Sequence, residues 1–304
     1  MQEREALQSD LLTHVTALKS QQRHSQALGF VETALPAVRL FWAESDIARA
    51  PLRYTPGIAV IVSGRKIGYV DDQRIAYGPG QYLAVGLPLY FECETFATKE
   101  APLVGLFLGS ETVALGDLAQ DLAAHDRPLL PAASALGIEP LVLPETMLEA
   151  TVRLARQLRT PAEAAVLGEN TLTEIFFHAL QDRHGRVLLG QTQSKRPEAR
   201  IAQVLRALDE GPGAAASIDS LAQAVGMSSA SFHRHFKAVT GLSPLQYQKR
   251  RRLMRAKSLL TFDKLSVNET ARAVGYASPT QFSRDFSAYF GMPPSRAELS
   301  VYPA

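Results

Sequence analysis

The sequence has almost no cysteine and no long hydrophobic run. Its 304 residues include one cysteine, Cys93, so an internal disulfide and a cysteine-rich zinc site are excluded. No apolar stretch approaches the ~18 residues that cross a membrane, and the first 26 residues mix acidic and basic side chains without the apolar core of a signal peptide. We therefore expect a soluble, cytoplasmic protein that has no membrane partner.

Histidine is absent from the part of the chain that carries a β-strand pattern. The seven histidines stand at positions 14, 24, 125, 178, 184, 233 and 235, all of them outside residues 34–110. An enzyme that holds a catalytic metal inside a small β-barrel needs a cluster of histidine and carboxylate ligands there. The sequence therefore predicts no metal, no cofactor and no catalytic residue, and it leaves an enzyme only as a remote alternative.

The net charge of the chain is small but unevenly divided. The whole chain carries +2, yet residues 195–304 contain 16 Lys and Arg against 8 Asp and Glu, a net +8, which leaves 16 basic and 22 acidic residues, a net −6, in residues 1–194. A basic segment of this kind is typical of a module that binds a polyanion such as nucleic acid. We therefore expect the two parts to have different functions.

Hydrophobic periodicity predicts a mixed N-terminal part. Residues 3–18 carry apolar side chains at helical spacing, and residues 34–108 consist of short apolar or alternating runs separated by turn residues, which indicates an antiparallel sandwich or barrel. A helical pair is expected within 140–185, and a capping box from Thr160 to Glu163 should begin its second helix. These helices are candidates for a dimer contact.

A polar segment separates this part from the basic part. Residues 191–197, QTQSKRP, lack periodicity and end in proline, as linkers commonly do. We therefore divide the chain into an N-terminal domain over residues 1–190 and a C-terminal domain over residues 195–304.

The basic part contains one short element twice. Five residues recur 50 positions later: Phe232 as Phe282, Arg234 as Arg284, Phe236 as Phe286, Gly241 as Gly291 and Pro244 as Pro294. Upstream, three residues recur 49 positions later: Ala222 as Ala271, Val225 as Val274 and Gly226 as Gly275. Each copy is typical of a helix, a tight turn that contains glycine, and a second helix. We predict helix-turn-helix motifs at about 217–240 and 266–290, with capping boxes at Ser266–Glu269 and Ser278–Gln281.

The second helix of each copy has an apolar and a polar face. In the first copy Phe232, Phe236 and Val239 have the i, i+4, i+7 spacing of a buried stripe. The opposite face is expected to meet base edges in the major groove of double-stranded DNA, where Arg pairs with guanine and Ala or Thr contacts the thymine methyl group. The predicted base-facing residues are Ala230, His233, Arg234 and Lys237 in the first copy and Thr280, Ser283 and Arg284 in the second.

A basic helix is predicted between the copies, over residues 244–260. Its apolar stripe should include Leu245 and Leu253, and most of its remaining surface is basic. Basic side chains on such a helix can neutralise DNA phosphates, which gives affinity and salt dependence without sequence preference. The predicted phosphate contacts are Lys249, Arg250, Arg251, Arg255 and Lys257.

These patterns resemble the AraC/XylS family of transcriptional regulators. The resemblance rests on A-x3-G followed by F-x3-F in both copies, on the joining pattern Y-x4-R-L-x2-A-x2-L-L that begins at Tyr247, and on F-G-x-x-P-S at 290–295. The segment GRKIGYVDDQRIAYGPGQYLAV is similar to the N-terminal effector domain of one branch of the family. The resemblance implies an α+β protein, with an N-terminal cupin-like antiparallel β-barrel flanked by helices and a C-terminal all-α domain with two helix-turn-helix motifs.

The resemblance also implies a function and partners. It implies a bacterial transcription activator that binds promoter DNA and contacts RNA polymerase. The protein is further expected to respond to a small-molecule effector in the barrel and to form a homodimer. By the family's pattern, Pro279 also faces the bases. A regulator without an effector, whose N-terminal domain only dimerises, stays open as an alternative, and a cupin-type enzyme is the remote one. The effector-binding residues are unknown, because Trp42, Tyr82 and Tyr90 are as typical of a core as of a pocket. Cys93 is expected to be buried and unreactive.

Overall fold

The computed structural model describes residues 2–21, 27–70, 73–125, 138–182, 185–189, 197–210, 217–261 and 263–297. The N-terminal helix predicted at 3–18 is present as α1 (Gln2–Gln21). The predicted linker at 191–197 lies outside the described residues apart from Pro197, which begins α5 (Pro197–Glu210).

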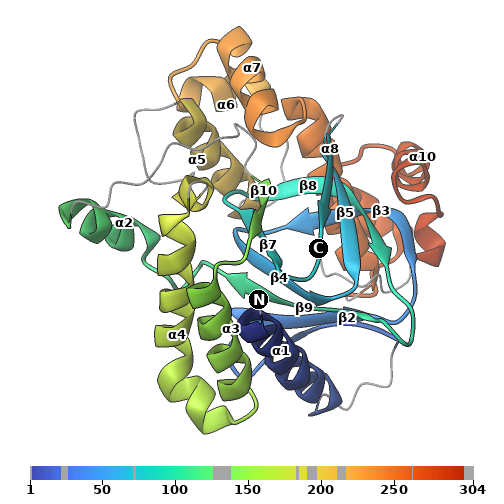
Figure 1. Ribbon diagram of the computed structural model, residues 1–304. Coiled ribbons are helices and arrows are strands. Elements are labelled where there is room, and N and C mark those ends of the chain that lie inside the picture. Colours follow the sequence, from blue (N-terminus) through green and yellow to red (C-terminus); the bar gives the residue numbers. More distant parts are fainter. Residues whose placement is uncertain are drawn as a thin grey trace.

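The strand-rich region forms two antiparallel sheets. The described strands are β1 (Leu28–Glu32), β2 (Val38–Ala43), β3 (Ile47–Tyr54), β4 (Gly57–Ser63), β5 (Arg65–Val70), β6 (Gln73–Tyr77), β7 (Gln81–Val85), β8 (Leu89–Phe96), β9 (Leu103–Gly109) and β10 (Ile138–Val142). Their order is β1-β2-β9-β4-β7-β10 in one sheet and β3-β8-β5-β6 in the other. The predicted antiparallel, cupin-like fold is confirmed, although the ladders of the described strands form two facing sheets rather than one closed barrel (Figure 1).

Strand β2 shows how alternating residues serve two separate cores. Leu40 and Trp42 belong to the core between the six-stranded sheet and the helices outside it. Phe41 and Ala43 belong to the core between the two sheets. Because successive side chains of a strand point to opposite faces, one apolar strand can complete both layers.

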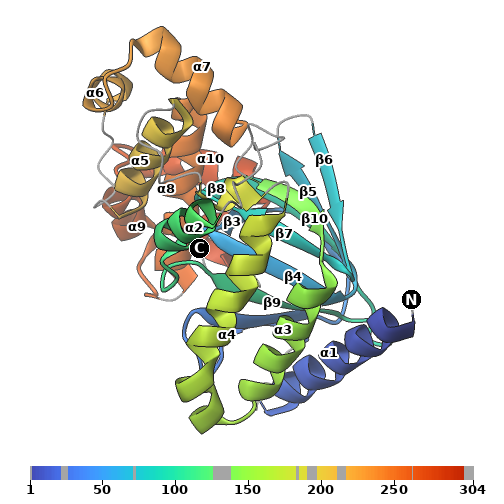
Figure 2. The ribbon, with the colours of Figure 1, turned by 60° about the vertical axis from the view of Figure 1, so that its left-hand side comes forward.

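Helices cover the outer face of the six-stranded sheet. Helix α1 lies there beside α3 (Glu145–Gln157), which packs along α4 (Pro161–Gln181), and α2 (Leu115–Ala124) contacts α4 (Figure 2). The helical pair is therefore confirmed. The predicted capping box at Thr160 is wrong, because the Thr160 side chain makes no cap hydrogen bond; Pro161 in the first turn begins the helix instead.

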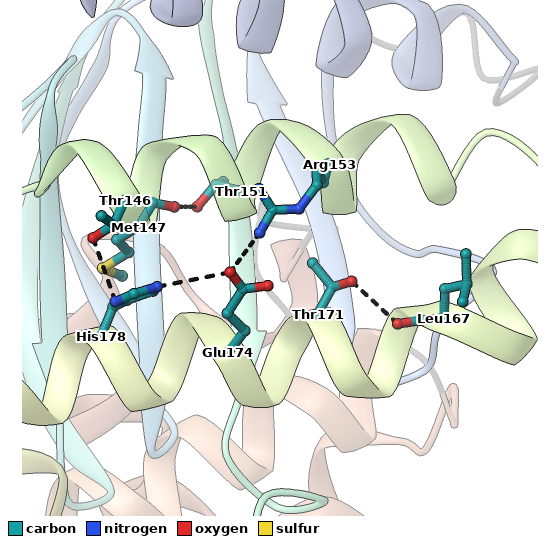
Figure 3. A network of polar contacts seen from close by, with 8 residues as sticks. All are labelled: Thr146, Met147, Thr151, Arg153, Leu167, Thr171, Glu174 and His178. Atoms are coloured by element: carbon teal, nitrogen blue, oxygen red, sulfur yellow. Dashed lines mark hydrogen bonds and ion pairs between the residues drawn. The ribbon is translucent and has the colours of Figure 1, made fainter.

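A polar network joins α3 to α4. Glu174 on α4 accepts a hydrogen bond from Arg153 on α3 and lies 3.7 Å from Nε2 of His178. The His178 ring nitrogen Nδ1 is in turn 3.3 Å from the hydroxyl of Thr146 (Figure 3). These contacts fix the two helices in register on their solvent side, while apolar residues fill the side that faces the sheet.

The C-terminal helices follow the predicted repeat. After α5 come α6 (Ile218–Ala224), α7 (Ser229–Thr240), α8 (Pro244–Thr261), α9 (Val267–Ala273) and α10 (Pro279–Phe290), and short 3-10 turns lie at Gly185–Leu189 and Pro294–Arg296. Both helix-turn-helix motifs and the helix between them are thus confirmed. The turn glycines have the positive φ that the motif requires, +64° at Gly226 and +82° at Gly275.

Serine caps begin the helices of both copies. The predicted capping box of Ser266 and Glu269 is present in full. At Ser278 only half of the predicted box forms: the Ser278 hydroxyl accepts from the backbone N–H of Gln281, but the Gln281 side chain donates to Asp285 Oδ1 at 3.0 Å. The local signal therefore predicted the helix start correctly and the second hydrogen bond wrongly.

Candidate nucleic-acid interface and adjoining cavity

The predicted reading helices α7 and α10 have the same construction. Each begins at a serine cap and ends at a glycine with a φ of +71°, Gly241 in the first copy and Gly291 in the second. The rings of Phe232 and Phe236 pack 5.4 Å apart, and those of Phe282 and Phe286 5.6 Å apart, all fully buried. These two-ring anchors fix the rotation of each helix and so decide which side chains remain outside.

The polar faces of both helices are at the surface. Exposed side chains are Ala230, His233, Arg234 and Lys237 on α7 and Thr280 and Arg284 on α10. Ser283 and Pro279 are half-buried. The four predicted base-facing residues of α7 are therefore exposed, as are two of the three on α10, and the contacts of all seven with DNA stay predictions.

Asp285 on α10 joins parts of the second copy through hydrogen bonds. Its carboxylate accepts hydrogen bonds from Lys249 Nζ at 2.8 Å and from the Tyr276 hydroxyl at 3.1 Å. Partial burial opposes its ionisation, but these donors, together with Gln281, hold the pKa of Asp285 below its ordinary value. The same burial and the nearby carboxylate raise the pKa of Tyr276 to about 12. Asp285 is thus a structural residue. Lys249, one of the predicted phosphate contacts, is exposed but forms an ion pair with Asp285.

The other predicted phosphate contacts have different surroundings. Arg255 is exposed. Lys257 is half-buried with its ammonium 4.8 Å from the centre of the Phe290 ring, and burial lowers the pKa of this lysine. Arg250 Nη1 donates to the backbone carbonyl of Tyr90 at 3.2 Å, and Arg251 is buried. Only part of the basic surface of α8 therefore faces solvent in this arrangement.

Helix α8 packs directly on strand β8. The Tyr247 hydroxyl donates to the backbone carbonyl of Pro88 at 2.9 Å, and its ring meets the edge of the Tyr90 ring at 5.0 Å. Burial raises the pKa of Tyr90 to about 12. Leu245, which the sequence placed in the apolar stripe, is 61% exposed; that prediction is wrong because Tyr247 and Leu253, not Leu245, face the packing partners of the helix.

A cavity of about 500 Å³ lies between the two sheets. Apolar side chains of both sheets line it, among them Phe30, Phe41, Leu52, Tyr54, Ile61 and Phe107. Sequence reasoning missed these residues. The alternation along β1, β2, β3, β4 and β9 places them on the inner faces of the two sheets, but no local signal distinguishes the wall of a cavity from a packed core.

The aromatic candidates named from the sequence do not line this cavity. Trp42 and Tyr82 are buried in the core under the outer helices, and Tyr90 is buried against α8. Cys93 is buried as expected, and burial raises the pKa of its thiol. A thiol of this kind is a poor nucleophile, because the thiolate is the reactive form.

The described residues contain no group of three or more His, Cys, Asp or Glu side chains that could hold a metal ion. None of the described helices combines the length and apolar composition that a membrane span requires.

Comparison with known proteins identifies two families. The family described as "AraC-type transcriptional regulator N-terminus" matches residues 34–187, half of the chain, and "Helix-turn-helix domain" matches residues 221–298. The first match covers β2 to β10 with α2, α3 and α4, and the second begins within α6 and extends past α10.

Individual relatives match different lengths of the chain. The RCS-specific HTH-type transcriptional activator RclR of Escherichia coli is 37% identical over 95 residues, which is 31% of this chain and 34% of that protein. The virulence regulon transcriptional activator VirF of Yersinia enterocolitica is 25% identical over 279 residues, 88% of this chain and 97% of that protein. The chain thus spans about a third of RclR and nearly all of VirF.

A solved structure has the same fold. ToxT from Vibrio cholerae, in its unsaturated fatty acid-bound form, superposes with a TM-score of 0.57 over 90% of this chain and 96% of that chain, at 10% identity. At this identity the likeness concerns the fold alone. Together with the family match over half of the sequence, it leads to one conclusion: the chain belongs to the AraC/XylS family of transcriptional regulators.

Proposed function

We propose that this chain is a transcription activator that binds a specific double-stranded promoter sequence through α7 and α10 and responds to a small molecule bound between its sheets. The observation that carries the proposal is the repeated helix with an exposed polar face, joined by a helix of 18 residues. Such a helix is about 27 Å long, a separation suited to successive major-groove segments on one face of a duplex, ~34 Å apart. One chain then reads an asymmetric site.

The base contacts in this proposal are divided between the two copies. Arg234 and Arg284 pair with guanine, while Ala230 and Thr280 contact thymine methyl groups. His233, Lys237 and Ser283 complete the reading faces. Arg255 and Lys249 are the exposed members of the phosphate set, and Arg250, Arg251 and Lys257 join them when α8 moves away from its present neighbours.

The cavity supports an effector rather than a purely dimerising N-terminal part. Its volume of about 500 Å³ lies within the 300–1,000 Å³ that is usual for small-molecule sites. A relative in fold, ToxT, has been solved with an unsaturated fatty acid. We therefore include a small-molecule effector in the proposal.

The proposal extends to two macromolecular partners. Activation requires contact with RNA polymerase, and the named relatives RclR and VirF are activators. A homodimer would use α4, where Val166 is 73% exposed and Leu167 45% exposed; neighbouring exposed apolar side chains are typical of an interface. A cytoplasmic location and the lack of enzymatic activity follow from the same role.

The test is a binding experiment with the full chain. Duplexes selected from a random library should bind more tightly than shuffled duplexes of the same composition at every salt concentration. The logarithm of the binding constant should fall linearly with the logarithm of the salt concentration, at about −0.9 per phosphate contacted. Equal affinity for all duplexes, or binding that is indifferent to salt, would contradict the proposal.

A matched pair of variants sharpens this test. Arg255→Ala, on α8, should weaken binding to every duplex alike and reduce the salt slope by about one contact. Arg156→Ala removes an arginine that is also exposed, from α3, and should leave the affinity and the salt slope unchanged.

A further inference from the structure

The wall of the cavity carries an excess of positive charge. Three cationic side chains line it, Arg39, Arg53 and Lys66, against one carboxylate, Glu32. Glu32 is exposed at the end of β1, whereas Lys66 on β5 is only 1% exposed. A molecule that enters the cavity therefore meets apolar side chains and three cations, of which Arg39 also lies 3.8 Å from Glu111.

Lys66 is the most buried of the three cations that line the cavity. Its ammonium is 5.9 Å from the centre of the Phe41 ring and 6.0 Å from that of Tyr54, both of them cavity residues. The hydroxyls of Tyr54 and Tyr77 hydrogen-bond to each other beside it. An anion that reaches this ammonium forms a charge-assisted hydrogen bond, and such a bond is stronger in an apolar surrounding than in water.

Arg53 belongs both to the cavity and to the contact with the C-terminal helices. It lines the cavity from β3, and its Nη2 donates to Asp209 Oδ2 on α5 at 2.6 Å. Helix α5 shares a core with the first helix-turn-helix copy, through Ile201 and Leu205 on α5 and Phe232 on α7. The guanidinium thus stands between the cavity and the helix that supports α7.

We propose that Arg53 couples the cavity to the first reading helix: a ligand with an apolar body and an anionic group such as a carboxylate binds on Lys66 and competes with Asp209 for the Arg53 guanidinium. The inference deepens the proposed effector function and rests on it. An arginine pairs with a carboxylate through a planar fork of N–H donors, so a second anion at the same fork weakens the bond to α5. The ligand then loosens α5 from β3.

The expected direction of the effect follows from the surroundings of α8. Arg250 is bonded to the Tyr90 carbonyl, and Tyr247 is bonded to the Pro88 carbonyl. Loosening α5 weakens the packing of the C-terminal helices on the sheets, so Arg250 can turn to a phosphate. The anionic ligand should therefore raise the affinity for DNA.

The ligand class is tested with two fluorescent probes that differ by one group. 8-Anilinonaphthalene-1-sulfonate has an apolar body with an anion, and N-phenyl-1-naphthylamine is the same body without the sulfonate. Lys66→Met should weaken binding of the anionic probe at least about tenfold, as expected for loss of a charged hydrogen bond, and leave the neutral probe within about twofold. Lys99→Met, which changes an exposed lysine, is the control. Equal changes for both probes would overturn the assignment.

A variant that keeps the positive charge tests the same assignment if Lys66→Met does not fold. Lys66→Arg keeps a cation at the same position and should retain preference for the anionic probe, even if Lys66→Met unfolds. Wild-type protein that binds the two probes equally, or Lys66→Arg that prefers the neutral probe, would contradict the inference.

The competition at Arg53 predicts a variant that binds the anionic probe more tightly, the opposite of Lys66→Met. Asp209→Asn removes the rival anion, so the anionic probe should bind about two- to fivefold more tightly, the range for a partly exposed ion pair. Asp219→Asn, on the exposed side of α6, should change nothing. Unchanged or weaker binding in Asp209→Asn would overturn the role of Arg53. Probe binding does not require DNA. A negative DNA-binding result would therefore contradict the proposed function, whereas a negative probe result would contradict only this inference.

Discussion

The two helix-turn-helix copies have the same helices and caps, but their cores differ. In the first copy Phe232 and Phe236 belong to a large core that includes α5, Tyr247 and residues of both sheets. In the second, Phe282 and Phe286 belong to a small core with Leu253, Ala256, Ala271 and Val274. The N-terminal part is therefore in direct contact with the first copy, whereas the second touches it mainly through Tyr289 and Phe290 at the end of α10.

The exposed polar faces of α7 and α10 differ in charge as well. The exposed face of α7 carries Arg234, Lys237 and His233, whereas that of α10 has Arg284 as its cation beside Thr280. The first copy is suited to electrostatic affinity, and the second to hydrogen bonds and methyl contacts. The two copies thus differ both in their contacts with the sheets and in the charge of their exposed faces.

Truncating the phenylalanine anchors should give the largest effect and separate the two cores. Phe232→Ala and Phe282→Ala should each cost about 3–5 kcal/mol of local stability. Hydrogen exchange on the full chain should speed up in α9 and α10 for Phe282→Ala, and in α5, α6 and α7 for Phe232→Ala. Faster exchange throughout the sheets in Phe282→Ala would show that the second core is not separate.

Arginine substitutions test the reading faces. Arg234→Ala and Arg284→Ala should each cost about 1–3 kcal/mol at a selected duplex and much less at shuffled duplexes. Arg272→Ala, an exposed arginine on α9, is the control. Equal losses on every sequence would make Arg234 or Arg284 a phosphate contact.

The contact between α8 and β8 should contribute less. Tyr247→Phe removes the hydrogen bond to the Pro88 carbonyl and should lower the free energy of unfolding by about 1 kcal/mol. Tyr69→Phe, whose hydroxyl meets Glu94 at the surface, should have a smaller effect in the same urea titration. Equal effects would mean that burial of the Tyr247 bond adds nothing.

The capping box of the second copy predicts a small dependence on pH. Hydrogen bonds from the Ser266 side chain and backbone lower the pKa of Glu269. A carboxyl with a lowered folded-state pKa adds stability above its unfolded pKa, about 4.3 for glutamate, and this stability is lost as the pH falls through the folded value. Glu269→Gln should therefore be less stable than the wild type at pH 7, and the difference should disappear in acid. A difference in urea midpoint that persists in acid would contradict this.

The C-terminal helices could be predicted from sequence because their signals are local and duplicated. The paired phenylalanines, the turn glycines Gly226 and Gly275 and the serine caps each set one feature of the backbone. Two copies that match at offsets of 49 and 50 positions make a chance pattern improbable. The strands from β2 to β9 were predicted for the same reason, since turn residues separate the short apolar runs within residues 34–108, whereas β1 and β10 lie outside that range.

The surroundings of the basic residues could not be predicted in this way. Helical periodicity places Arg250 and Arg251 on the polar side of α8, but the helix packs against β8 as well as against the second copy. Which surface covers a helix is a long-range property. The ion pair of Arg53 with Asp209 joins residues 156 positions apart, and no pattern within either segment indicates it.

The most direct test of the central claim, that α7 and α10 of one chain read one duplex, maps where each arginine acts. Binding of Arg234→Ala and Arg284→Ala is measured against a selected site and every single-base-pair variant of it. Each substitution should abolish discrimination in one short segment, and the two segments should lie about one helical turn, 10–10.5 base pairs, apart. Loss of discrimination at the same base pairs in both variants would contradict this claim.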